Sequence, residues 1–321
     1  MSILTVIEQM IVICLLILIG MVLYRKGQLK DLTVQQISAL IINVTNPALL
    51  LNSAFSAADR VPAGKVLQGI LLFTCCYGAA YLIGALIPFL LHAERRDHYA
   101  YQMMTVYGNV GFIGIPLALA VLGNDSLIYV SMNNLVYNVF FYTSGIMVLS
   151  KRAEQEKSGG KASESHVSLP DFMKKIVNIG TVSVVLTIAV YLLNPKIPGV
   201  VSDTLRYAGN ATTFLSMLVL GASVAAMPLR SIFTDLRIYL FTALRMVVMP
   251  VVLILVLRPL ISDRMLMEVT ALLLAVPAGN LPMIVSREFG LKDELFSKGI
   301  IVTTLLSPVT ITLVMLLTGA G

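Results

Sequence analysis

The chain has 321 residues, of which 57% are hydrophobic and only 12% are charged, and its net charge at pH 7 is +6. Because a soluble domain usually carries about twice this share of charged residues, the composition excludes an ordinary soluble protein and predicts an all-α integral membrane protein. The basic residues lie in short loops between apolar runs, where they report membrane topology and do not indicate a nucleic-acid partner.

Apolar runs between charged residues predict ten membrane-spanning helices, since one span needs about 20 mostly apolar residues. In chain order they lie within residues 3–24, 32–58, 66–93, 98–124, 126–150, 176–195, 207–229, 238–257, 269–286 and 299–321. With both termini outside, most of the 23 lysine and arginine residues fall in internal loops, as the positive-inside rule requires. We therefore expect a multi-pass protein of the plasma membrane with its N- and C-termini outside.

The second predicted span contains polar and kinking residues, Asn43, Asn46 and Pro47. Asn43 and Asn46 are three residues apart and would share one face of an α-helix. Buried polar residues in a span usually face the protein interior. The pair is interpreted either as part of a substrate site or as a source of hydrogen bonds between helices.

The fourth span contains the sequence YGNVGFIGIP at residues 107–116. Pro116 has no N–H group to donate and clashes with the carbonyl four residues earlier, and Gly108, Gly111 and Gly114 lower the cost of non-helical dihedral angles. Backbone groups that a break leaves free in lipid must be satisfied by protein or by a water-lined cavity. The stretch predicts a broken helix; the alternative is that its glycines only allow close helix packing.

The fifth span carries a polar stripe formed by Asn134, Tyr137 and Asn138 at i, i+3 and i+4. This stripe is interpreted either as the lining of a cavity or as a polar ridge packed against neighbouring helices.

The hydrophilic stretch at residues 151–175 divides the ten spans into five and five and is predicted to be a cytoplasmic linker. The domains are then a first five-helix repeat, residues 1–150, and a second five-helix repeat, residues 176–321. Because five is an odd number, the second repeat would insert upside down in the membrane. Inverted repeats with interrupted helices in corresponding positions are typical of secondary transporters.

The eighth span contains Arg245, which is the only charged residue deep within a predicted run. A charge inside the membrane suggests a functional site. Arg245 is interpreted either as a residue that attracts an anion from the cytoplasm or as a structural anchor near Pro250.

The ninth span repeats the broken pattern of the fourth in the sequence VPAGNLPMIVS at residues 276–286, with Pro277 and Pro282 as its helix-breaking residues. The N-termini of half-helices carry partial positive charge and can bind an anion without a fixed cation. We therefore expect the substrate to be bound by the two Gly-Asn pairs of the broken spans, Gly108 with Asn109 and Gly279 with Asn280.

Three stretches together, NVTNPALL, YGNVGFIGIPLALAVLG and VPAGNLPMIVSREFG, resemble the auxin efflux carrier family, whose bacterial members are often described as malate, malonate or auxin permeases. The resemblance covers nearly the whole chain. It implies ten helices in two inverted five-helix repeats, with broken helices 4 and 9 crossing near the substrate, as in bile-acid and sodium–proton transporters. It also implies small organic anions as substrates and favours a homodimer.

These observations predict a secondary transporter of small organic anions that works by alternating access. The sequence offers no pattern of catalytic residues, and its three cysteines fall in apolar runs, so we expect no enzyme activity, no cofactor and no metal site. A sodium-coupled symporter of the bile-acid type and a transporter-like channel or receptor stay open as alternatives.

Overall fold

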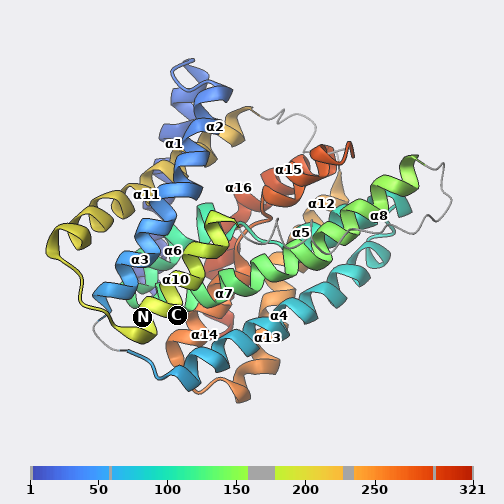
Figure 1. The fold of residues 1–321 in the computed structure, drawn as a ribbon. Helices are drawn as coiled ribbons and strands as arrows, with labels where there is room; N and C mark the ends of the chain where they lie inside the picture. The colour runs from blue at the N-terminus through green and yellow to red at the C-terminus, as the bar shows by residue number, and fades with distance from the viewer. Residues whose placement is uncertain (1–2, 58–59, 158–177, 227–234, 292–293, 320–321) are drawn as a thin grey trace.

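The computed structural model describes residues 3–57, 60–157, 178–226, 235–291 and 294–319, which form helices joined by short loops (Figure 1). The first half contains α1 (Ile3–Arg25), α2 (Asp31–Leu40), η1 (Ile41–Thr45), α3 (Asn46–Ser56), α4 (Ala63–Leu90), η2 (Arg95–Asp97), α5 (His98–Val106), η3 (Val110–Gly114), α6 (Ile115–Leu122), η4 (Asn124–Ser126), α7 (Leu127–Phe140), η5 (Phe141–Gly145) and α8 (Ile146–Lys157). The second half contains α10 (Ile179–Leu193), α11 (Gly199–Ala226), α12 (Leu236–Ala243), η7 (Leu244–Val248), α13 (Met249–Leu257), η8 (Arg258–Leu260), α14 (Arg264–Ala275), α15 (Leu281–Glu288) and α16 (Glu294–Leu317). In the described part of the chain no strand forms, so the expected all-α fold is confirmed there.

Six helical segments are long and apolar enough to cross a membrane. They are Ile7–Arg25, Asp31–Ser56, Ala63–Leu90, Gly199–Ala226, Leu236–Leu260 and Glu294–Leu317. Apolar side chains project outward from them, for example Leu15 and Leu18 of α1 and Leu82 and Leu86 of α4. Such a surface suits contact with lipid and would be unfavourable in water.

The other four predicted spans are not continuous apolar helices of that length. The fourth is divided between α5 and α6, and the ninth between α14 and α15. The sixth, α10, has 15 residues, and the helix that starts with α7 carries several asparagines. The count of ten spans and the inverted repeat therefore stay predictions.

Three of the helical segments contain a π turn that ends two residues before a proline. The segments η1, η3 and η7 precede Pro47, Pro116 and Pro250, respectively. A proline within an α-helix clashes with the carbonyl four residues earlier and leaves that carbonyl without its hydrogen bond. The wider π turn, with bonds from i to i+5, relieves this conflict, so that the helix continues through the proline.

The two helix breaks lie upstream of Pro116 and Pro282, whereas Pro277 lies within the second break. In the fourth segment the non-helical residues are Tyr107–Asn109, whereas Gly111 and Gly114 belong to η3 and Pro116 lies in the first turn of α6. Pro282 likewise lies in the first turn of α15. Proline is favoured there because its missing N–H would have no partner within the helix.

Helix α11 packs against the backbones of α1 and α3, and these three helices lie together on one side of Figure 1. Glycines permit this approach. A Cβ atom at Gly221 would touch the carbonyl oxygen of Ile17, and one at Gly209 would lie 2.8 Å from the Cα atom of Leu49. A Cβ atom at Gly20 of α1 would meet the backbone of α11 in the same way.

The predicted linker begins as a continuation of α8, which is helical as far as Lys157. Residues 158–175 of the linker lie outside the described residues.

Candidate binding site at the crossing of two helix breaks

The breaks in the fourth and ninth segments lie side by side. The Asn109 N–H donates to the carbonyl oxygen of Pro277 at 2.8 Å, and the Gly279 N–H donates to the carbonyl oxygen of Tyr107 at 2.9 Å. These bonds flank an antiparallel bridge between Gly108 and Ala278. Each break thus satisfies backbone groups of the other, as any interruption of a helix at membrane depth requires. We call Tyr107–Asn109 together with 277–279 the crossing.

The two glycines of the crossing allow this contact. A Cβ atom at Gly279 would lie 2.8 Å from the carbonyl oxygen of Gly108, and one at Gly108 would lie 2.7 Å from Cγ2 of Val276. Side chains at these positions would push the two segments apart.

A cavity of 220 Å³ opens beside the crossing. Most of the residues predicted to form a site line it, namely Asn46, Pro47, Gly108, Asn109, Gly111, Asn134, Tyr137, Asn138, Gly279 and Asn280. They come from α3, the two breaks, the start of η3 and α7. No Asp, Glu, Lys, Arg or His is among the described residues that line the cavity.

Three asparagine amides at this cavity keep a hydrogen-bonding atom free. Asn46 donates from Nδ2 to the Gly111 carbonyl at 3.3 Å, and its Oδ1 is buried without a partner. Asn109 accepts at Oδ1 from the Phe112 N–H at 3.3 Å, and its Nδ2 is buried without a partner. Oδ1 of Asn280 is also unpartnered. Because an unsatisfied buried polar atom costs free energy, these amides are suited to form hydrogen bonds with a polar ligand.

Two helix N-termini point into the same space. Asn109 caps η3, which continues into α6, and Asn280 occupies the N-cap position of α15 without a side-chain capping bond. Phe112 and Leu281, from the first turns of these helices, line the cavity. The first N–H groups of a helix have no partner within it and carry the positive end of its dipole. The arrangement can therefore accept a negatively charged group.

Tyr137 forms a rigid part of the cavity wall. Its ring stacks on Phe141 with centroids 6.2 Å apart and meets Tyr107 edge-on at 5.5 Å. The Tyr107 hydroxyl in turn donates to the Phe140 carbonyl at 3.0 Å. This aromatic cluster gives the cavity a planar, apolar side.

The remaining predicted residues lie elsewhere. Asn43 is exposed on η1 and does not reach the cavity, whereas Asn46 is buried. The reason is the π turn: it holds more residues per turn than an α-helix, so two residues three apart no longer share a face. Gly114 packs against Leu273 instead, because a Cβ atom there would lie 2.9 Å from Cδ2 of that leucine. Pro116, Pro277 and Pro282 are buried beside the cavity and do not line it.

Several lining residues were not predicted from the sequence. They are mainly Phe112, Tyr142, Asn178 and Ser183. Asn178 caps α10 by accepting a hydrogen bond at Oδ1 from the Thr181 N–H at 3.1 Å. An asparagine directly before an apolar run is a typical helix-capping signal, which could have drawn attention to this residue.

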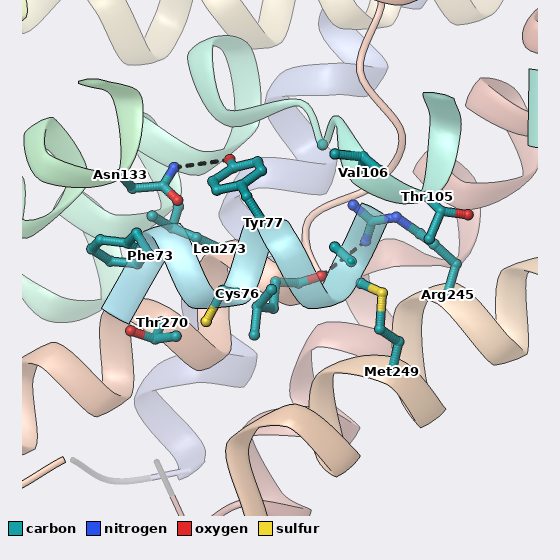
Figure 2. Close-up of a pocket in the computed structure, with 13 residues that line it drawn as sticks. Phe73, Cys76, Tyr77, Thr105, Val106, Asn133, Arg245, Met249, Thr270 and Leu273 are labelled. Atoms are coloured by element: carbon teal, nitrogen blue, oxygen red, sulfur yellow. Dashed lines mark hydrogen bonds between the residues drawn. The ribbon is translucent and has the colours of Figure 1, made fainter. Parts of the chain in front are cut away.

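Arg245 does not line the 220 Å³ cavity but lies behind the crossing, where it borders a much smaller pocket (Figure 2). It is only 2% exposed. Its Nε donates to the Met104 carbonyl at 3.2 Å, and one terminal nitrogen, Nη1, donates to the Leu274 carbonyl at 2.9 Å. Elsewhere in the lining of this pocket, Asn133 donates to the Tyr77 hydroxyl at 3.4 Å, as a dashed line in Figure 2 shows.

Comparison with known proteins identifies relatives along nearly the whole chain. A family pattern described as "Membrane transport protein" matches residues 5–315. A "Putative malonate transporter" of Rhizobium meliloti is 24% identical over 89% of this chain and 87% of its own length. An "Uncharacterized transporter" of Methanothermobacter thermautotrophicus is 23% identical, and one of Methanocaldococcus jannaschii is 24% identical; each match covers 95% of this chain and 96% of the relative.

Proposed function

This chain belongs to the membrane transport protein family, the auxin efflux carrier family that its motifs resemble, and from that premise we propose that it is a secondary carrier of small organic anions. The family consists of membrane transporters, which are not enzymes. The observation that carries the proposal is the convergence of two helix N-termini and the unpartnered Nδ2 donor of Asn109 on a cavity whose described lining residues carry no charge.

We propose that the substrate binds through a carboxylate group. Each helix N-terminus carries about half a positive charge, so the two ends at the crossing supply roughly one charge in total. That matches a single carboxylate, whose oxygens would accept hydrogen bonds from first-turn N–H groups and from the amide of Asn109. The Tyr137 ring would pack against the apolar part of the substrate. Malate, malonate and auxin-like acids are the candidates, and charge balance favours acids with one carboxylate at this site.

The transport mechanism follows from the proposed topology. Ten spans in two inverted repeats, residues 1–150 and 176–321, would place the crossing near the middle of the plasma membrane, with both termini outside. Alternating access would move the crossing helices against the frame of α1, α3, α10 and α11. We propose that two such chains form a homodimer.

The test is counterflow in proteoliposomes with labelled malate, malonate and indole acetate. We expect uptake of at least one anion to be accelerated by the same anion inside. Asn109→Ala should reduce that uptake by about tenfold, the effect of one hydrogen bond to a charged group. Asn280→Ala should also reduce it, because Asn280 stands at the N-terminus of α15 in the cavity. Asn43→Ala is the matched control and should transport normally, since Asn43 is exposed outside the cavity.

Other outcomes would point to the alternatives. Flux without counterflow would indicate a channel, and binding without flux would indicate a receptor. Uptake that requires sodium would favour a symporter of the bile-acid type. Normal counterflow in both cavity variants would refute the assignment of the binding site, while leaving the carrier function in place.

A further inference from the structure

Arg245 bonds to the ends of both half-helices that run into the crossing. Met104 lies in the last turn of α5, which ends at Val106, and Leu274 lies in the last turn of α14, which ends at Ala275. The last four carbonyl groups of a helix have no partner within it and carry the negative end of its dipole. The guanidinium donates to one such carbonyl on each half-helix, at 3.2 and 2.9 Å.

The charge of Arg245 has no carboxylate partner in the described part of the chain, where the ion pairs involve other residues. A charge that is 2% exposed is costly unless something compensates it. Two helix C-termini carry about half a negative charge each, and together they match one guanidinium. Arg245 and the ends of α5 and α14 thus form a nearly neutral group.

Arg245 also touches the crossing itself. A Cβ atom at Gly108 would lie 2.9 Å from Nη2 of Arg245, so the guanidinium packs directly under this glycine. The side chain comes from η7, whose π turn lies on the neighbouring helix in front of Pro250. One side chain therefore holds both incoming half-helices and supports the backbone that they present to the cavity.

We propose that Arg245 is a positioning residue whose guanidinium takes the place of a bound cation at the crossing. In secondary transporters, the C-terminal ends of broken helices often coordinate a coupling sodium ion or proton. In this chain the guanidinium occupies that position, so the crossing keeps its shape and binds the carboxylate without a metal cation. The inference rests on the proposed carrier function and extends it to the coupling ion.

The experiment compares Arg245→Lys with Arg245→Gln in the counterflow assay. Lysine keeps the charge, whereas glutamine keeps a hydrogen-bond donor of similar length without the charge. We expect Arg245→Gln to lose at least about tenfold in uptake and Arg245→Lys to stay within about threefold of the wild type. Arg237→Ala is the control, because Arg237 is an exposed arginine on the same helical segment. Equal uptake by the lysine and glutamine variants would overturn the proposal.

Chemical rescue of Arg245→Ala separates charge from shape. Guanidinium and urea are planar, nearly equal in size and able to donate hydrogen bonds to carbonyls, but only guanidinium is charged. We expect guanidinium to restore uptake and urea to have no effect. Rescue by urea to the same extent would show that the side chain only fills space and donates hydrogen bonds. Wild-type uptake should be unchanged when sodium is replaced by choline, and a strict sodium requirement would contradict the inference.

Thermal unfolding in detergent keeps the proposal testable if the carrier function fails. A wild type that shows no counterflow would refute the proposed function only. The unfolding midpoints of the variants would then decide the role of Arg245, because the proposal requires a higher midpoint for Arg245→Lys than for Arg245→Gln. The reverse order, or equal midpoints, would overturn it.

Discussion

Replacing Gly279 by alanine tests whether the contact between the two helix breaks holds the protein together. The new Cβ atom would lie 2.8 Å from the carbonyl oxygen and 3.1 Å from the carbonyl carbon of Gly108, and 3.1 Å from the carbonyl oxygen of Tyr107. All three atoms belong to the backbone, so no side-chain rotation can relieve the clash. The two segments must separate, which lengthens the hydrogen bonds from Asn109 to Pro277 and from Gly279 to Tyr107.

The expected loss of stability follows from these contacts. Overpacking a tightly packed site costs about 1–3 kcal/mol, and each weakened hydrogen bond adds up to about 1 kcal/mol. We expect a total of about 2–4 kcal/mol, which corresponds to a fall of roughly 5–10 °C in the unfolding midpoint. Counterflow should fall as well, because the same separation moves the amide of Asn109 relative to that of Asn280.

The assay measures unfolding through the exposure of Cys76, because the chain contains no tryptophan whose fluorescence could report it. Cys76 is only 1% exposed, whereas Cys75 is exposed and Cys14 is partly exposed. A thiol-reactive dye in a background with serine at positions 14 and 75 therefore reports unfolding. Gly78→Ala is the matched control, because nothing lies within 4 Å of a Cβ atom there. A normal midpoint for Gly279→Ala, or an equal loss for Gly78→Ala, would refute the reasoning.

Three further predictions concern contacts away from the cavity. Gly221→Ala should destabilise the protein by about 3 kcal/mol or prevent its folding, because the new methyl group meets the backbone of α1; normal expression and unfolding midpoint would contradict this. Arg60→Ala should lower the free energy of unfolding by about 1–3 kcal/mol and the midpoint with it, since Arg60 donates to the carbonyls of Tyr191 and Ala54, and Arg60→Lys should recover only part of the loss. Asp263 has a pKa below its usual value: burial raises it, but hydrogen bonds from the N–H of the residue three positions on, from a tyrosine and from a lysine lower it more. Its stabilisation should therefore be present above about pH 4 and be lost as the pH falls through its folded-state pKa, a dependence that Asp263→Asn should abolish in midpoints measured between pH 3 and 6.

The sequence predicted the cavity better than it predicted the helices around it. Gly108, Asn109, Gly279 and Asn280 could be recognised because glycine and asparagine have strong local preferences at helix breaks and caps. Three of the π turns precede a proline, but a proline alone does not predict a π turn, since other helices of this chain contain a proline without one. The turn η1 therefore placed Asn43 away from the site that its spacing with Asn46 suggested. Such changes of register come from tertiary packing and from a proline further along the chain.

Arg245 shows the limit of sequence reasoning for a single residue. Its burial in an apolar run was evident, but its two partners, Met104 and Leu274, are 141 and 29 residues away. Both partners are backbone carbonyls, to which the residue type contributes nothing. No pattern of side chains could therefore have indicated which atoms would compensate the charge. The contact depends on where α5 and α14 end in space.

The glycine contacts between α11 and its neighbours determine which surfaces of the molecule can slide. At Gly221 and Gly20 the backbones of α1 and α11 touch directly, so no side chains lie between them whose rotamers could change. Shear between helices needs such side chains, since it proceeds by small rotamer adjustments in an interface that stays packed. We therefore expect α1 and α11 to move as one unit, so that the proposed alternating access would use other contacts, such as those of α7 with α3 and α10 and of α1 with α16. A methyl group at Gly221 would therefore first disturb the contact between α1 and α11, although Gly221 does not line the cavity.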